Sequence, residues 1–347
     1  MIDLNNSDQK TIQVSVYCLA YNHEKYIKKT LEGFVNQITN FEFEVFVHDD
    51  ASTDRTPKII QEYVDNYPAI IKPIFQKENQ YSKGIKMMTV YLLPRMKGRY
   101  IASCEGDDYW NDPYKLQKQF DAMETHPECS LSTHLVRCCN EDGSPNTRVI
   151  PEQYYKIEGS RVIEKEELAQ CYWIRGNYPF HTSSYFYRRK ILDMVLDYPR
   201  DVGILRKCFI EGSMYYIDEP MSTRRLWSLG NWNSRLKEGG VESRWKLALD
   251  VDAAEDRFDL YTKYAYHDYV SFARMNRFLE FIKSAQYRKK AKKVLRQYEL
   301  SPWKIKKKLS LATFLKLQAK YTLGMYFSGC YSGIQKLWWM FMGYHET

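Results

Sequence analysis

Three carboxylates surround a glycine in the segment Cys104-Glu105-Gly106-Asp107-Asp108-Tyr109-Trp110. The apolar run just before it, residues 100–104, predicts a buried strand that ends at these acids. Carboxylates this close repel one another, so an ordered cluster of them favours a bound cation. Side chains that offer only oxygen ligands favour Mg²⁺ or Mn²⁺ over zinc. A solvated acidic turn is the alternative interpretation of this segment taken alone.

A second acidic loop, His48-Asp49-Asp50-Ala51-Ser52-Thr53-Asp54, follows another apolar run at residues 43–47. The carboxyl ends of the strands in a parallel sheet face one crevice. We therefore expect the acids at positions 49, 50, 105 and 107 to converge on one ligand site, which favours the cation over the solvated turn.

Strands and helices alternate around these two loops. The sequence predicts strands at residues 11–19, 43–47, 70–75 and 100–104 with helices between them, then a helix at 113–125 and further strands at 131–139, 180–187 and 214–217. This alternation predicts an α/β fold with a mostly parallel sheet covered by helices on both faces. Long helical periodicity begins after Gly239-Gly240, where we expect the domain boundary.

Positive charge is concentrated at the end of the chain. The 347 residues carry a net charge of +8, but residues 283–347 alone carry +12, so residues 1–282 carry −4. Residues 283–308 hold eleven Lys/Arg, and an apolar, aromatic stretch follows without a run long enough to cross a membrane. A basic segment followed by such a stretch favours interfacial helices on an anionic membrane surface. A solvated helix face followed by a packing helix is one alternative and nucleic acid binding is another, and the aromatic residues Trp303, Trp338 and Trp339 favour the membrane.

The eight cysteines are scattered and form no CxxC pair, which predicts free thiols in a reducing compartment. The first residues lack the basic and apolar stretches of a signal peptide. We therefore expect a cytoplasmic protein, peripheral on the inner face of the cell membrane.

Three segments together resemble the family 2 glycosyltransferases, which have the GT-A fold. They are residues 14–22 (VSVYCLAYN), 47–54 (VHDDASTD) and 104–110 (CEGDDYW), and the resemblance covers about residues 11–230. It implies a catalytic domain at residues 1–238, with a donor half at about 11–112 and an acceptor half at about 113–238. Residues 239–347 form the helical C-terminal region, with the basic, membrane-associating tail at 283–342.

The resemblance also implies roles for particular residues. Tyr21 and Asn22 would lie beside the nucleotide base, and Asp50, together with Asp49, would hydrogen-bond the base or ribose. Asp107 would hold the Mn²⁺ or Mg²⁺ ion that bridges the donor diphosphate, and Glu105 stands at the first acid of the motif. These assignments predict a nucleotide-sugar donor as the ligand.

The chain departs from the family pattern at several positions. Leu19-Ala20 replaces the usual Pro-Thr, Ala51 replaces a glycine, and Trp227 replaces a histidine. Because that histidine is missing, Arg225 or Arg224 is expected to carry the phosphate charge.

An inverting transferase needs a general base beside the acceptor hydroxyl. Related sequences place an acid where Asp201 stands, and a helix N-cap is the alternative interpretation of this residue. Glu211 and Asp218 are the rival candidates. On the acceptor side we expect His181 and Thr182, together with Trp110, which can also pack behind the acidic loop. His23 and His48 are expected to face solvent.

The sequence thus predicts a metal-dependent inverting glycosyltransferase. Its donor would be a nucleoside-diphosphate sugar, here UDP-linked, and its acceptor a saccharide or lipid-linked saccharide in cell-surface polysaccharide synthesis. A nucleotidyltransferase is one alternative, but residues 20–24 lack the Gly-rich phosphate loop that this chemistry uses. A catalytically weak nucleotide-sugar-binding or membrane-associated protein is the other, and Ala20 and Trp227 favour it.

Overall fold

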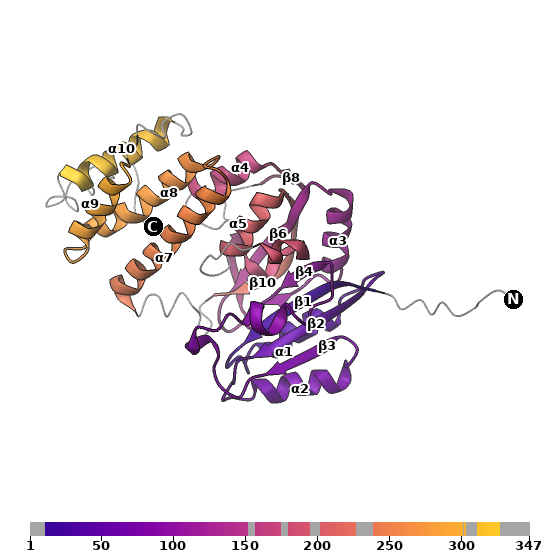
Figure 1. Ribbon diagram of the computed structural model, residues 1–347. Coiled ribbons are helices and arrows are strands. Elements are labelled where there is room, and N and C mark those ends of the chain that lie inside the picture. Colours follow the sequence, from indigo (N-terminus) through magenta and orange to yellow (C-terminus); the bar gives the residue numbers. More distant parts are fainter. Residues whose placement is uncertain are drawn as a thin grey trace. The chain divides into compact units, whose positions relative to one another are not determined.

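The computed structural model describes residues 11–151, 157–174, 180–194, 202–226, 239–300, 302 and 311–326. The chain divides into two compact units (Figure 1). Unit 1 contains Met1–Leu168, Tyr178–Val195 and Ile204–Leu229, and unit 2 contains Ala169–Asn177, Leu196–Gly203 and Gly230–Thr347. The domain boundary expected after residue 238 stays a prediction, because residues 227–238 lie outside the described ranges.

The first half of unit 1 is a parallel α/β layer. Its elements are β1 (Ile12–Ala20), α1 (Ile27–Val35), β2 (Glu42–Asp49), α2 (Thr56–Asn66), β3 (Ile71–Phe75) and β4 (Tyr100–Ser103). The strands pair in the order β3-β2-β1-β4, all parallel. Helix α1 buries Ile27, Leu31 and Phe34, whose spacing puts them on one helical face. The four strands predicted here are confirmed to within two residues at either end.

The segment between β3 and β4 contains only short turns. The 3₁₀ turn η1 (Tyr81–Lys83) and the π turn η2 (Met88–Leu92) occupy the region where a helix up to about residue 96 was expected. Only Leu92 is buried in these two turns, so little apolar packing supports a longer helix there.

The second half of unit 1 extends the sheet with mixed pairing. Its elements are β5 (Tyr109–Trp110), α3 (Lys115–Thr125), β6 (Cys129–Cys139), β7 (Pro145–Ile150), β8 (Arg161–Ile163), α4 (Lys165–Ala169), η5 (Thr182–Ser184), β9 (Phe186–Arg188), η6 (Arg189–Asp193), α5 (Val202–Glu211) and β10 (Ser213–Arg225). The strand order continues β4-β9-β6-β10-β5. The expected helix at 113–125 and strands at 131–139 and 214–217 are found as α3, β6 and part of β10, whereas the strand expected at 180–187 is reduced to η5 and β9.

The sheet is therefore mixed rather than mostly parallel. Strand β9 runs antiparallel to both β4 and β6, and among the described strands of this half only β6 and β10 pair in parallel. Apolar periodicity reports which face of a strand is buried, and it carries no information on strand direction. The α/β class, with helices flanking the sheet and further helices at the C-terminal end, is confirmed (Figure 1).

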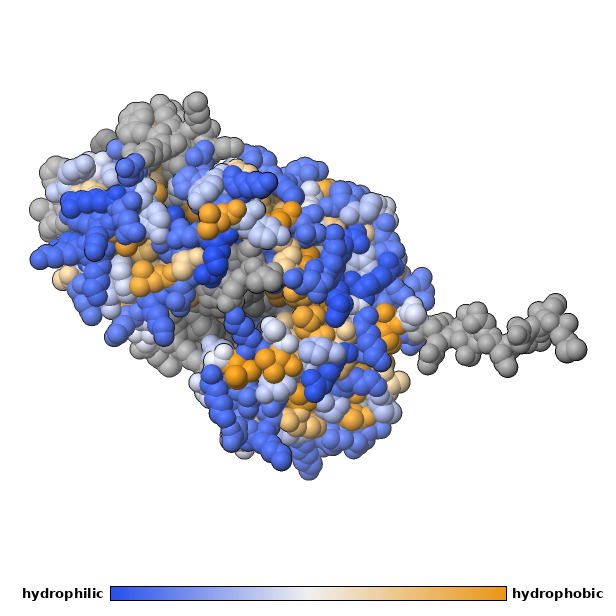
Figure 2. Space-filling model, in the orientation of Figure 1, coloured by the Kyte–Doolittle hydropathy of each residue, from blue (hydrophilic) through white to orange (hydrophobic). Residues whose placement is uncertain are grey.

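Unit 2 is helical. It contains α7 (Gly240–Tyr261), α8 (His267–Leu279), η7 (Glu280–Lys283), α9 (Arg288–Gln297) and α10 (Leu311–Tyr326), together with the earlier segment η4 (Gln170–Ile174). Trp173 in η4 packs against Phe258 and Tyr269 of these helices. Among the described helices, none is long and apolar enough to span a bilayer. The described surface in Figure 2 is mainly hydrophilic, with apolar side chains in small groups.

Candidate functional site

Three loops meet at the carboxyl end of the parallel strands. Ala20 at the end of β1 lies opposite Asp49 at the end of β2. The amide of Asp50 donates to the carbonyl of Ala20 at 3.0 Å, and the amide of Gly106 donates to the carbonyl of Leu19 at 2.9 Å. The loops that follow β1, β2 and β4 are thus joined directly through the backbone.

Hydrogen bonds lock the loop after β1 to the loop after β2. The amide of Asn22 donates to Ser52 Oγ at 2.8 Å, and Asn22 Oδ1 accepts from the amide of Thr53 at 2.8 Å. Ser52 in turn donates through Oγ to Asp49 Oδ1 at 2.5 Å and through its amide to Asp49 Oδ2 at 3.1 Å. Asn22 and Asp49 therefore shape this loop pair.

Two residues of this loop pair have left-handed backbone conformations, with φ of 57° at Asn22 and 61° at Ala51. Asparagine tolerates this region, but alanine adopts it at a cost of roughly 1 kcal/mol. The replacement of the family's glycine by Ala51 is therefore a strained substitution, held in place by the hydrogen bonds around it.

Asp50 fixes a third loop. Its carboxylate accepts from the backbone amides of Gln80 at 2.7 Å and Tyr81 at 3.0 Å, where η1 begins. A carboxylate has about four lone-pair sites, so these two bonds leave room for further donors. Asp50 is 5% exposed and Asp49 is 1% exposed. Burial raises the pKa of the Asp49 carboxyl, and the two hydrogen bonds from Ser52 oppose that rise.

The acidic loop after β4 depends on close packing at Gly106. A Cβ at this position would lie 2.6 Å from His23 Nδ1 and 3.1 Å from Ile27 Cδ1, so only glycine fits without displacement. Thr30 of α1 donates through Oγ1 to the carbonyls of Gly106 at 3.0 Å and Asp108 at 2.6 Å, and these bonds hold the turn against α1. Glu105 and Asp107 are half-buried in this arrangement.

Asp108 points into the protein and is 4% exposed. Its carboxylate accepts from the backbone amide of Arg225 at 2.7 Å, and its Oδ2 lies 3.7 Å from His181 Nε2. Burial raises the pKa of Asp108 well above its usual range, and the neighbouring Asp107 adds to the rise. Burial, together with the charge of Arg224, lowers the pKa of His181 well below its usual value.

Arg225 holds the acidic loop from the end of β10. Its Nε donates to the carbonyl of Asp107 at 3.2 Å and its Nη1 donates to the carbonyl of Glu141 at 2.8 Å. The guanidinium carbon also lies 4.8 Å from the ring centroid of Tyr26, within cation–π range. Arg225 thus lies beside the acidic loop, and its contact with phosphate stays a prediction.

The expected acceptor residues lie in and beside η5. Ser103 Oγ donates to the carbonyl of Thr182 at 2.8 Å, and Trp110 Nε1 donates to the carbonyl of Ser183 at 3.0 Å. Trp110 is 3% exposed and packs edge-on against Phe34 at 4.8 Å, the position behind the acidic loop that the sequence also allowed. The expected general base, Asp201, lies outside the described residues, as does Trp227.

Two histidines differ from the sequence analysis. His48 is fully buried, so the expectation that it faces solvent was wrong. The Nδ1 atom of His23 is also buried and has no hydrogen-bond partner within the described ranges. Burial lowers the pKa of His23, and Asp107, Asp54 and Asp49 oppose this shift, which places the ring among the acids of both loops. In the sequence, only the position of His23 directly after Asn22 indicated that its ring would lie near these loops.

The acidic loop fits a cation whose coordination is completed by water and by the phosphates of a bound substrate. Within the described residues, no three His, Cys, Asp or Glu side chains form a group that could hold a metal ion by themselves. Mg²⁺ is usually bound through one or two carboxylates, with waters and substrate phosphates supplying the other oxygens. The half-buried carboxylates of Asp107 and Glu105 fit that mode of binding.

Three kinds of comparison connect the chain to known proteins. An uncharacterized protein of Mycobacterium tuberculosis is 34% identical over 226 residues, which is 64% of this chain and 61% of that protein. Escherichia coli WfaP, a UDP-Glc:alpha-D-GlcNAc-diphosphoundecaprenol beta-1,3-glucosyltransferase, is 38% identical over 112 residues, 32% of this chain and 41% of that protein. The chain therefore spans less than two thirds of the length of these curated relatives.

Among solved structures, S. aureus TarS 1–349 in complex with UDP-GlcNAc matches with a TM-score of 0.54 at 19% identity, covering 91% of this chain and 93% of that one. At this identity the match shows a shared fold, and it confirms the expected GT-A class. The family model for glycosyl transferase family 2 matches residues 15–195. Because this match covers more than half of the 347 residues, the chain belongs to glycosyl transferase family 2.

Proposed function

We propose that this family 2 glycosyltransferase transfers a sugar, with inversion at its anomeric carbon, from a UDP-linked donor to a saccharide or lipid-linked saccharide acceptor. The process would be cell-surface polysaccharide synthesis, and the cofactor Mn²⁺ or Mg²⁺. One observation carries the proposal: the acidic loop of Glu105 and Asp107 is joined by backbone hydrogen bonds to the loops of Tyr21 and Asp50. A donor needs a base-binding surface and a site for its diphosphate, and these loops supply both.

The loops bind and orient the donor in this proposal. Tyr21 is half-buried, and its hydroxyl has no hydrogen-bond partner in the part of the chain that the structure describes, so its ring suits contact with the base. Asp50, possessing unused lone pairs, accepts from the base or ribose. A divalent cation at Asp107 would offset the charge on the departing diphosphate. Arg225 and the less buried Arg224 add positive charge on the same side.

We assign the general base to Asp201. As the acceptor oxygen bonds to the anomeric carbon and the bond to the diphosphate breaks, this carboxylate takes the hydroxyl proton. The residue directly precedes α5, which starts at Val202, so the N-cap alternative stays open. Both rivals have partners: Glu211 pairs with Lys190 at 2.8 Å, and Asp218 accepts from the amide of Gly159 at 3.0 Å.

The proposed site of action is the cytoplasmic face of the membrane. The E. coli relative carries a diphosphoundecaprenol acceptor in its name, which supports a lipid-linked acceptor. In unit 2, α9 buries Ala291 and Leu295 and exposes Lys289, Lys290, Lys293 and Arg296. None of these four cations pairs with a carboxylate in the described ranges, and each could contribute about 1 kcal/mol at an anionic surface.

Donor hydrolysis in the presence of Mn²⁺ tests the transferase proposal. The wild-type protein should slowly release UDP from a UDP-sugar, and Asp107→Asn should lower this rate by roughly 100-fold or more, because the carboxylate that holds the cation is lost. Asp121→Asn, on the exposed side of α3, is the matched control and should hydrolyse donor like the wild type. Unchanged turnover in Asp107→Asn would contradict the metal assignment, and pyrophosphate release would favour a nucleotidyltransferase.

A second experiment tests the general base. With donor and acceptor present, Asp201→Asn should abolish transfer but leave donor affinity intact, whereas Glu211→Gln and Asp218→Asn should retain transfer. If transfer is lost only in Glu211→Gln or only in Asp218→Asn, the residue changed in that variant is the general base and Asp201 is not. Thermal shifts with a panel of nucleotide sugars would identify the donor, because a ligand that binds only the folded form raises its melting temperature.

A further inference from the structure

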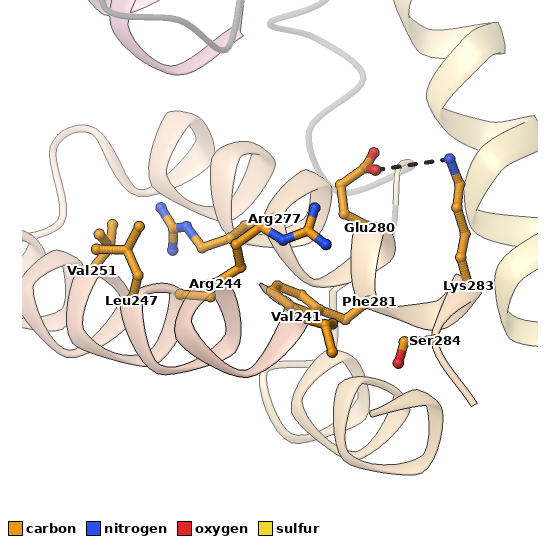
Figure 3. Close-up of a pocket in the computed structure, with 10 residues that line it drawn as sticks. Val241, Arg244, Leu247, Val251, Arg277, Glu280, Phe281, Lys283 and Ser284 are labelled. Atoms are coloured by element: carbon orange, nitrogen blue, oxygen red, sulfur yellow. Dashed lines mark ion pairs between the residues drawn. The ribbon is translucent and has the colours of Figure 1, made fainter. Parts of the chain in front are cut away.

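A cavity of about 730 Å³ lies within unit 2, between α7 on one side and the end of α8 with η7 on the other (Figure 3). Val241, Arg244, Ala248 and Val251 recur at helical spacing along α7, so they share the face that lines the cavity. This cavity belongs to none of the loops that bind the donor in the proposed function.

One wall of the cavity is apolar. Val241, Leu247 and Val251 are only half-buried, so their side chains are not fully covered by the described residues. Trp245, on the neighbouring face of α7, is part of the packed core of unit 2. Its ring centroid lies 5.0 Å from that of Phe281 and 5.0 Å from that of Tyr287. The apolar wall therefore borders the core, against which Val241 packs, and its half-buried side chains leave apolar surface that a ligand could cover.

The rim of the cavity is positively charged. Its one carboxylate, Glu280, faces Lys320 at 2.5 Å and Lys283 at 3.9 Å, the second of which is drawn as a dashed line in Figure 3. Arg244 is exposed and forms no ion pair with any carboxylate that the structure describes. Among the described residues of this rim, Arg244 is thus a cation without an ion pair, whereas the charge of Arg277 is matched by Asp252 at 3.4 Å and Glu255 at 3.9 Å.

The positive charge continues from the rim onto α9. Arg288 at the start of α9 donates through Nε to the carbonyl of Ile282 in η7 at 3.0 Å, so the two elements are in direct contact. The sequence of α9, RKKAKKVLRQ, contains no acid. An anion at the cavity rim would therefore sit at the edge of a larger basic surface.

We propose that this cavity binds one anionic lipid from the membrane. Arg244 and Lys283 hold the phosphate of the head group, and the adjoining hydrocarbon lies along Val241, Leu247 and Val251. A nucleic acid or an acidic polymer matches the cations equally well, but it offers no hydrocarbon to cover the apolar wall. The inference deepens the membrane association proposed above and rests on it, because the same face of unit 2 would have to reach the bilayer.

Calorimetric titration of the full-length protein with a short-chain lipid, below its micellar concentration, tests this site without a membrane. Dihexanoyl phosphatidylglycerol should bind saturably, with at least tenfold higher affinity than dihexanoyl phosphatidylcholine or glycerol 3-phosphate. Equal affinity for phosphatidylcholine would overturn the role of the cations. Equal affinity for glycerol 3-phosphate would show a simple anion site and overturn the lipid assignment, and so would no binding at all.

Variants locate the binding. The double variant R244E/K283E should lower phosphatidylglycerol affinity by tenfold or more, and Leu247→Ser should lower it without changing the weak binding of glycerol 3-phosphate. Lys246→Glu is the matched control, because Lys246 is exposed on α7 and does not line the cavity. Wild-type affinity in the double variant, or an equal loss in the control, would overturn the site.

The same preparations separate this inference from the transferase proposal. Donor hydrolysis by each variant should equal that of the wild type, which also shows that the variants fold. If the wild type binds phosphatidylglycerol but never hydrolyses a donor, the transferase proposal fails and the lipid site stands. If hydrolysis is normal and no lipid binds, the lipid site fails alone.

Discussion

Lys115 in unit 1 and Arg274 in unit 2 are both buried over an aromatic ring, and their charges are compensated in different ways. In unit 1, Lys115 is fully buried, donates to Gln119 Oε1 at 2.6 Å, and has its Nζ 4.1 Å from the ring centroid of Trp110. In unit 2, Arg274 is 1% exposed and lies 3.9 Å from the ring of Tyr298, but it pairs with both Asp252 and Asp256 at 2.5 Å.

The pKa values respond in opposite directions. Burial lowers the pKa of Lys115 to about 7, since no carboxylate partner opposes it strongly. Burial also acts to lower the pKa of Arg274, but Asp252 and Asp256 outweigh it and the pKa rises.

The buried acids follow the same contrast. Asp49, Asp50 and Asp108 in unit 1 are held by backbone amides or a hydroxyl, and none of them pairs with a described lysine or arginine. Asp252 in unit 2 pairs with Arg274 and with Arg277. An acid paired with arginine is already neutralised and serves the fold. Acids held by neutral donors have no ion-paired lysine or arginine among the described residues to match their charge, and burial raises the pKa of Asp49 and Asp108.

The largest expected effect concerns the ion pairs of Arg274 in unit 2. Arg274→Met should lower the free energy of unfolding by about 3–5 kcal/mol, because it leaves Asp252 buried without its main partner. Urea denaturation followed by circular dichroism measures the loss. Lys246→Met, an exposed change on α7, should stay within about 0.5 kcal/mol. A loss below about 1 kcal/mol for Arg274→Met would mean that the ion pairs do not hold unit 2 together.

The next effect concerns Lys115 and is seen in the pH dependence of the free energy of unfolding. The pKa of Lys115 is about 7 in the folded chain and near 10.5 when unfolded, so between these values the unfolded chain binds one more proton. Its contribution to stability therefore rises with pH across this window, by up to about 1.4 kcal/mol per pH unit. Lys115→Met removes this slope, so its stability relative to the wild type should be highest at pH 7 and should decline toward pH 10.

Urea denaturation of both proteins at pH 7, 8.5 and 10 measures the difference, and subtraction cancels groups that titrate in both. Lys118→Met on the same helix is the control. Asp112 and Glu219 outweigh burial and raise the pKa of Lys118, so its difference from wild type should stay flat over this range. A flat difference for Lys115→Met as well would mean that Lys115 keeps its proton in the folded state over this pH range, which would contradict the lowered pKa.

The smallest effect concerns the neutral donors that hold the acids. Ser52→Ala removes the hydroxyl that joins Asp49 to Asn22, and should cost about 1 kcal/mol. The cost should be the same in 0.05 M and 0.5 M NaCl, because the donor is uncharged. A cost that shrinks strongly with salt would show that the acids depend on charge pairing after all. Thermal denaturation at the two salt concentrations measures it.

Much of unit 1 could be read from the sequence. Apolar runs predicted β1, β2, β3 and β4 closely, and the acids after β2 and β4 were expected at one end of the sheet, where the backbone hydrogen bonds of Gly106 and Asp50 now join their loops. The antiparallel insertion of β9 between β4 and β6 could not be predicted, because a three-residue strand carries almost no periodicity.

The sequence by itself determined which residues are acidic, which runs are apolar and where strands end, since these properties depend on neighbours along the chain. Only the tertiary structure decided how each charge is compensated. Lys115 and Arg274 are both basic residues in amphipathic helices, and nothing local separates them. Their pKa values move in opposite directions because the partners that approach them, Gln119 for one and Asp252 with Asp256 for the other, are selected by packing in three dimensions.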